Sequence, residues 1–159
     1  MSRAWRFVLA GGLVAGTFDI VYACVFWAIK RGVSPPRILQ RVASGWLGEA
    51  SLTGGLTTAA LGLVSHYAIA ISMAVTYYLV ARRWPALWER AVPYGVAYGL
   101  LLYGIMNHVV VPLSAAGPSS TDPLWIGMSI VVHMLLIGLP CALFARRAIL
   151  ADLRSPVPA

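Results

Sequence analysis

The sequence predicts an all-α membrane protein with four transmembrane helices and an interfacial amphipathic helix between the first and the second. Of its 159 residues, 60% are hydrophobic and only 11% are charged. The mean hydropathy is +0.79, so the chain cannot cover itself with an ordinary solvated surface. Four apolar runs are each long enough to cross a hydrocarbon core of about 30 Å. We therefore expect a single transmembrane domain over residues 1–159.

The net charge of +7 is distributed in a way that suits membrane topology. Basic residues lie between the apolar runs, where they set orientation and meet anionic lipid headgroups. No basic stripe or RNA-binding aromatic motif is present, so nucleic-acid binding is not expected. If the amino terminus is cytoplasmic, that side carries eight arginines and the outer side four basic residues, which favours both termini in the cytoplasm.

The first span is expected over residues 7–29. Two arginines precede it, but the run is too long for a secretory signal and carries Asp19 at its centre, so we expect it to be retained. Gly12, Gly16 and Asp19 follow helical spacing on one face. Small residues at this spacing allow close helix approach. The acid is therefore expected in a helix contact and not in lipid.

The connection that follows predicts an interfacial helix over residues 35–48. Pro35 and Pro36 can occupy its first turn, and apolar residues then recur at helical spacing opposite a polar face. Trp46 is expected at headgroup depth. Glu49 is interpreted as an acid that pairs with a nearby arginine or is solvated.

The second span is expected over residues 54–80. Its centre carries His66 on a stripe of small residues that repeats every four positions. The stripe consists of Thr58, Gly62, His66, Ala70 and Ala74. His66 therefore has the same kind of setting as Asp19, and each stripe predicts a close neighbouring helix.

The third span is expected over residues 94–111, with Gly95 and Gly99 as a second close-packing pair. Asn107 and His108 fall near its outer end. The fourth span is expected over residues 124–145. It places His133 near mid-depth and Pro140 where a bend is expected. The tail that follows is expected to be loose.

Asp19, His66 and His133 are all predicted near the middle of their spans, so the three side chains could meet. A carboxylate and an imidazole would lower each other's cost of burial. Histidine also titrates near neutrality, so such a pair could carry a proton. The alternative is a clamp that fixes helix register. Asn107 and His108 are interpreted as satisfied polar residues.

Other chemistry has weaker support. His66 and His133 are the minimum for a bis-histidine haem, but no cofactor is predicted from this depth match alone. A metal site lacks ligand pairs at helical spacing, and no enzyme is expected because phosphate-binding and dinucleotide-binding motifs are missing. Cys24 and Cys141 fall in apolar runs and are interpreted as packing residues.

Several segments resemble those of small bacterial membrane proteins without a settled activity. These are Arg37–Gln40, Ala43–Gly45, Gly54-Gly55 and Thr58–Leu63 ahead of His66. Residues 62–147 are also similar to the YagU-like inner-membrane family in the placement of Pro85, His108, Pro112-Leu113, Trp125 and His133. The resemblance implies a bacterial inner-membrane protein with four helices, and it transfers no catalytic residue.

Two functions from different classes follow. The first is a small transport or proton-linked permeation unit that uses Asp19 and His66 and forms homo-oligomers through the glycine faces of spans one and three. The second is an accessory subunit or assembly factor that docks on a larger membrane complex through its small-residue faces and interfacial helix. Membrane lipids are partners in both.

Overall fold

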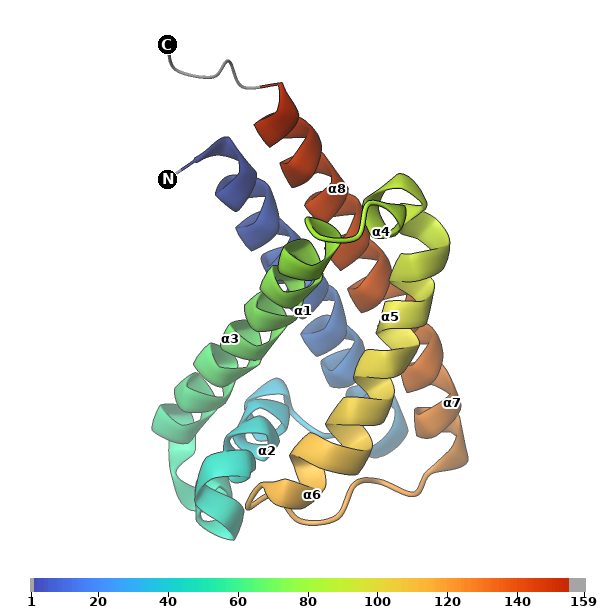
Figure 1. Cartoon of the computed structure of the whole chain (residues 1–159). Helices are drawn as coiled ribbons and strands as arrows, with labels where there is room; N and C mark the ends of the chain where they lie inside the picture. Colours follow the sequence, from blue (N-terminus) through green and yellow to red (C-terminus); the bar gives the residue numbers. More distant parts are fainter. Residues whose placement is uncertain (1, 155–159) are drawn as a thin grey trace.

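The structure is a computed structural model that describes residues 2–154 (Figure 1). Its described part contains four helices long and apolar enough to cross a membrane, and a shorter helix between the first and the second, which confirms the predicted fold class. The four spans cover Arg3–Arg31, Gly55–Ala81, Ala91–Leu113 and Pro123–Leu153. By helix length and hydropathy, the chain is a multi-pass membrane protein.

The first two spans are the single helices α1 (Arg3–Arg31) and α3 (Gly55–Ala81). Between them lie α2 (Pro35–Leu47) and a 3₁₀ turn over Gly48–Thr53, and a short α4 (Ala86–Glu89) follows α3. The third span joins α5 (Ala91–Ile105), a π-helical segment over Met106–Val110 and α6 (Val111–Leu113). The fourth joins α7 (Pro123–Val132), a second π segment over His133–Gly138 and α8 (Leu139–Leu153).

Each π segment ends two residues before a proline. Pro112 and Pro140 have no N–H group, and a proline ring clashes with the carbonyl four residues earlier in a regular α-helix. Those carbonyls belong to His108 and Leu136, which fall inside the two π segments. The wider π turns therefore accommodate the prolines. Near Pro140, where we expected a bend in the helix, the structure has a π-helical segment.

The expectation of a loose tail after Arg147 is wrong for the described residues, because α8 continues to Leu153. Ala148 and Ile149 are buried in the core, and the hydroxyl of Tyr78 donates to the carboxylate of Asp152 at 2.9 Å. The double arginine ends the apolar run but not the helix. Residues 155–159, which share that prediction, lie outside the described part.

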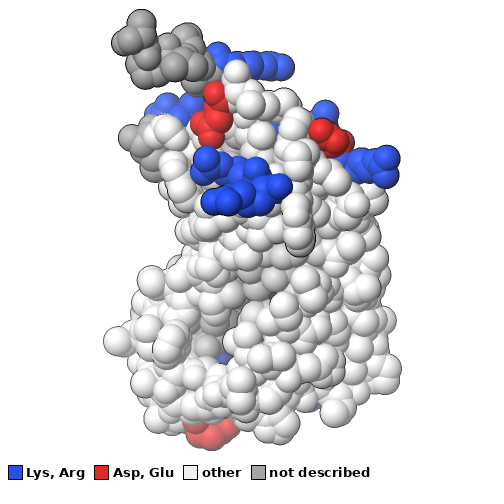
Figure 2. All heavy atoms as spheres, viewed as in Figure 1, with Lys and Arg blue, Asp and Glu red and all other residues white. Residues whose placement is uncertain are grey.

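The core is concentrated where α1 begins and α8 ends, at the end of the molecule that carries most of the arginines (Figure 1). Small side chains dominate it, as expected for helices that pack closely in a membrane. Figure 2 shows Lys and Arg side chains gathered at this end, above a middle band without charge. We call it the arginine-rich end; its residues are Arg3, Arg6, Arg82, Arg83, Arg90, Arg146, Arg147 and Arg154.

The glycine pairs predicted for close packing do pack closely, but within the chain. A Cβ atom on Gly12 would lie 2.6 Å from the Cα of Ile71 in α3, and one on Gly99 would lie 2.1 Å from the carbonyl oxygen of His133. Gly16 and Gly95 likewise face α3 and α8. Neighbouring helices of the described chain therefore occupy these glycine faces, and contact between copies stays a prediction.

The helix predicted over residues 35–48 is present as α2, which packs against the first turns of α3. At Gly62 a Cβ atom would lie 1.9 Å from the carbonyl oxygen of Leu39, so only glycine permits this approach. The indole of Trp46 donates to the Ser65 hydroxyl at 3.0 Å. The small-residue stripe of α3 thus serves two neighbours, since Gly62 faces α2 and Ala70 faces Gly16 of α1.

Candidate intramembrane polar site

Three of the predicted polar residues, Asp19, His66 and His133, lie at a similar level of the bundle. Nε2 of His66 is 2.8 Å from the carbonyl oxygen of Gly16, which lies less than one turn before Asp19. The hydroxyl groups of Tyr22 and Ser129 are 3.5 Å apart, and Ser129 lies one turn before His133. These contacts place Asp19, His66 and His133 at a similar height on α1, α3 and the fourth span.

Asp19 and His66 nevertheless do not pair. The ion pairs among residues 2–154 are Lys30–Asp122 and Arg41–Glu49, and the described hydrogen bond of His66 goes to a backbone carbonyl. A carbonyl only accepts, so Nε2 of His66 carries the proton and Nδ1 is an acceptor in the neutral ring. Asp19 and His66 are both half-buried.

His133 has the complementary arrangement. Its Nδ1 donates to the carbonyl oxygen of Ser129 at 2.8 Å, which leaves Nε2 as the acceptor in the neutral ring. The ring meets Tyr103 of α5 edge to face, with centroids 5.4 Å apart. His133 is half-buried and begins the second π segment. Each of the two histidines at this level thus has one ring nitrogen that its backbone bond does not use.

The remaining predicted polar positions lie away from this level or are satisfied locally. The amide of Asn107 donates to the carbonyl oxygen of Tyr103 at 3.0 Å, whereas His108 is exposed. Glu49 lies 3.8 Å from Arg41, with both side chains largely exposed, as the pairing interpretation predicted. Exposed pairs of this kind contribute little.

Three tyrosines complete the polar level and were not predicted. Tyr22 lies three residues after Asp19, and Tyr103 packs on His133. The hydroxyl of Tyr67 is 2.9 Å from that of Thr17 on α1. The one available signal was the three-residue step from Asp19 to Tyr22, which puts both on neighbouring faces of a helix.

At the end opposite the arginines, an aromatic and ionic contact joins α1 to α7. Tyr22 stacks on Trp125 with ring centroids 5.3 Å apart, and Lys30 forms an ion pair with Asp122. Asp122 also caps α7 by accepting from the backbone N–H of Trp125 at 3.1 Å. The hydrogen bond from Lys30, followed by the one from Trp125, holds the pKa of the Asp122 carboxyl below its usual value.

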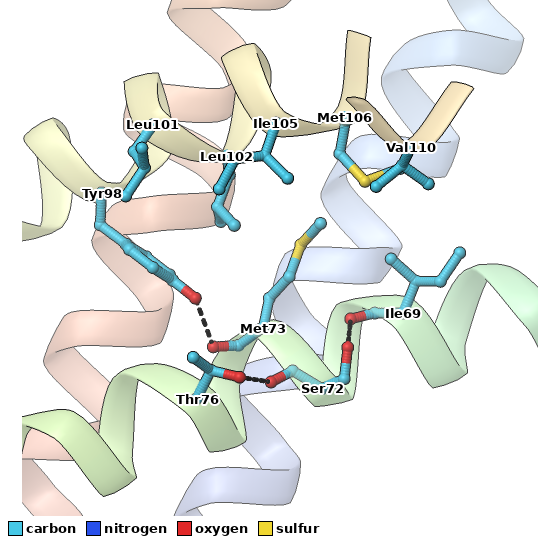
Figure 3. A pocket seen from close by; sticks show the side chains of 10 residues that line it. All are labelled: Ile69, Ser72, Met73, Thr76, Tyr98, Leu101, Leu102, Ile105, Met106 and Val110. Carbon is cyan, nitrogen blue, oxygen red and sulfur yellow. Dashed lines mark hydrogen bonds between the residues drawn. The ribbon is translucent and has the colours of Figure 1, made fainter. Parts of the chain in front are cut away.

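A groove of about 420 Å³ lies between α3 and α5, which diverge towards α2 (Figures 1 and 3). Its hydroxyl groups are all satisfied by backbone carbonyls. Ser72 donates to Ile69 at 2.6 Å, Thr76 donates to Ser72 at 2.8 Å, and Tyr98 donates across the groove to Met73 at 2.9 Å. The groove therefore offers no free hydroxyl donor to a bound molecule.

No group of three or more His, Cys, Asp or Glu side chains among residues 2–154 is arranged to hold a metal ion. For a bis-histidine haem, His66 and His133 would each have one ring nitrogen outside their backbone bonds. Comparisons with protein-family models, curated proteins and solved structures gave no match. The resemblance to YagU-like proteins therefore stays a prediction.

Proposed function

We propose that this chain is a small transport or proton-linked permeation unit, with Asp19, His66 and His133 as its titrating groups. The observation that carries the proposal is the shared level of one acid and two histidines on three different spans. Ionisable residues inside a membrane are costly, and such groups commonly line proton or ion paths.

The hydrogen bonds of the two histidines are compatible with a role in proton transfer, and the bond from His66 to Gly16 also ties α3 to α1. Each histidine is oriented by one backbone carbonyl, and its second ring nitrogen is left to accept a proton. Asp19 has no basic partner within ion-pair distance in the described chain. A carboxylate held in a salt bridge would be less able to exchange protons near neutral pH.

The proposal places the protein in the bacterial inner membrane with both termini in the cytoplasm. The arginine-rich end would then face the cytoplasm, in agreement with the positive-inside rule. A bundle of this size is expected to work as a homo-oligomer. Because Gly12, Gly16, Gly95 and Gly99 are occupied within the chain, the contact between copies would use other lipid-facing surfaces.

The accessory-subunit hypothesis has less support. It relied on small-residue faces for docking, and these faces already hold α1, α3, α5 and α8 together. Its test is gentle solubilisation from native membranes. Recovery of a larger complex of fixed composition would favour the accessory role over the transport role.

The permeation proposal is tested with purified protein in vesicles that contain a pH-sensitive dye, under an imposed potassium diffusion potential. Asp19→Asn and His66→Ala are each expected to lower the proton flux at least about tenfold. His108→Ala is the matched control, because this histidine is exposed and lies away from the polar level. Wild-type flux equal to that of empty vesicles would refute the proposal, as would equal flux in all three variants.

A further inference from the structure

We propose that the groove between α3 and α5 is a binding site for one anionic phospholipid, with an acyl chain in the groove and the phosphate at Arg83 and Arg90. This inference does not depend on the permeation proposal. It rests on the chemistry of the groove wall, on the length of the groove and on the positive charge near one end of it.

The groove wall selects an apolar occupant. The hydroxyl groups of Ser72, Thr76 and Tyr98 donate hydrogen bonds to backbone carbonyls (Figure 3). The other lining side chains are aliphatic or methionine. An acyl chain packs against such a wall without leaving any of these hydroxyl donors unpaired.

The groove is long enough to take part of an acyl chain. It measures about 420 Å³, and its α3 wall from Ile69 to Thr76 covers about two helical turns, or roughly 11 Å. A single acyl chain is thin enough to lie along a wall of this length.

The groove leads to unpaired positive charge. On α3, the groove face continues from Thr76 to the exposed Leu79, and Arg83 lies in the turn that follows the end of α3 at Ala81. On α5, the same spacing leads from Tyr98 to the exposed Tyr94, and Arg90 lies in the turn immediately before α5 begins. Neither arginine belongs to an ion pair of the described chain. Figure 2 shows Lys and Arg side chains above the hollowed middle of this face.

Together these features match a phospholipid of the leaflet at the arginine-rich end. Basic pockets between transmembrane helices are known to hold anionic headgroups, and each arginine near the membrane surface favours an anionic lipid by about fivefold in affinity. Arg82 is not part of the proposed site, because it already lies over the Tyr78 ring at 5.6 Å.

The test is native mass spectrometry of the full chain in detergent, titrated with phosphatidylglycerol or with phosphatidylcholine of the same chains. The wild type is expected to retain one phosphatidylglycerol and to bind it at least about fivefold more tightly than phosphatidylcholine. The double variant Arg83→Gln/Arg90→Gln should lose that preference. Arg146→Gln, at an exposed arginine of α8 with no described contact, should keep it.

The chain contact is tested by filling the groove. Ser72→Trp should weaken retention of both lipids, and Leu101→Trp on the opposite wall gives a second variant if the first does not fold. Glycerol phosphate, which has the headgroup charge without a chain, should not bind. Equal affinity for the two lipids, unchanged retention in both tryptophan variants, or a second copy of the chain seated in place of lipid would overturn the proposal.

Discussion

The two halves of this bundle are built differently. At the arginine-rich end, α1, α3, α5 and α8 enclose a core of small side chains around Tyr77 and Tyr78. Towards α2, the helices diverge, and α1 has no buried residue after Ile20. The polar level with Asp19 and the two histidines lies in this more open half.

This difference in packing indicates which half stabilises the fold and which half can change conformation. Transmembrane helices gain stability from close packing, which needs small residues at the contact. Elements with few buried contacts open at lower free energy and are the usual places for ligand binding and movement. We therefore expect the arginine-rich half to hold the fold and the α2 half to accommodate protons, water or lipid.

The largest expected effect comes from forcing two closely packed helices apart. Gly99→Leu places a side chain where a Cβ atom already lies 2.1 Å from the carbonyl oxygen of His133. Overpacking of this severity is expected to cost about 3 kcal/mol. Gly104→Leu, in the same helix with no atom within 4 Å of its Cβ, is the control. Thermal unfolding in detergent should separate them, and equal midpoints would contradict the packing argument.

A second pair of variants compares the halves directly. Ile149→Ala removes a side chain that is 7% exposed in the closely packed core and should cost about 2 kcal/mol. Leu101→Ala removes one that is 56% exposed on the groove and should cost less than about 0.5 kcal/mol. Unfolding of both proteins in lipid-free detergent measures the difference. Similar losses would mean that the halves contribute equally to stability.

The smallest effect concerns pH and the more open half. Because the folded-state pKa of Asp122 is lowered, its contribution is fully present above the unfolded value of about 3.9 and is lost as pH falls through the folded value. The unfolding midpoint should therefore fall as the medium is acidified below about pH 4. Asp122→Asn keeps a capping side chain but removes the ion pair with Lys30.

In that variant, the part of the acid response due to Asp122 should disappear. Glu49→Gln is the control, since the Arg41–Glu49 pair is largely exposed. An acid response that is the same in Asp122→Asn and wild type would show that the Lys30 contact does not carry it.

Hydropathy and glycine spacing were enough to predict the spans, α2 and the closely packed faces, because these depend on local sequence. The sequence could not tell which helix each face would meet. Gly12 and Gly99 fit two different neighbours in one chain, although the same pattern is compatible with contact between copies. That choice depends on the three-dimensional arrangement of all four spans.

The site shows the same limit. Counting residues from the span ends placed Asp19 and His66 at one depth, but depth does not fix the direction of a side chain around the helix axis. His66 turns to the backbone of Gly16 and not to the carboxylate. The continuation of α8 was missed because Ala148 and Ile149 follow two arginines, and hydropathy averages hide buried positions that lie beyond charged ones.

The second π segment also changes which directions the side chains of the fourth span face on its two sides. A π turn takes up one residue more than an α turn, so it shifts the faces on its two sides by about 100° relative to an uninterrupted α-helix. This shift lets Ser129 meet Tyr22 of α1 while Ala142 meets Gly95 of α5. Deleting one residue between His133 and Gly138 would restore a regular α-helix. Ser129 and Ala142 could then no longer face Tyr22 and Gly95 at the same time.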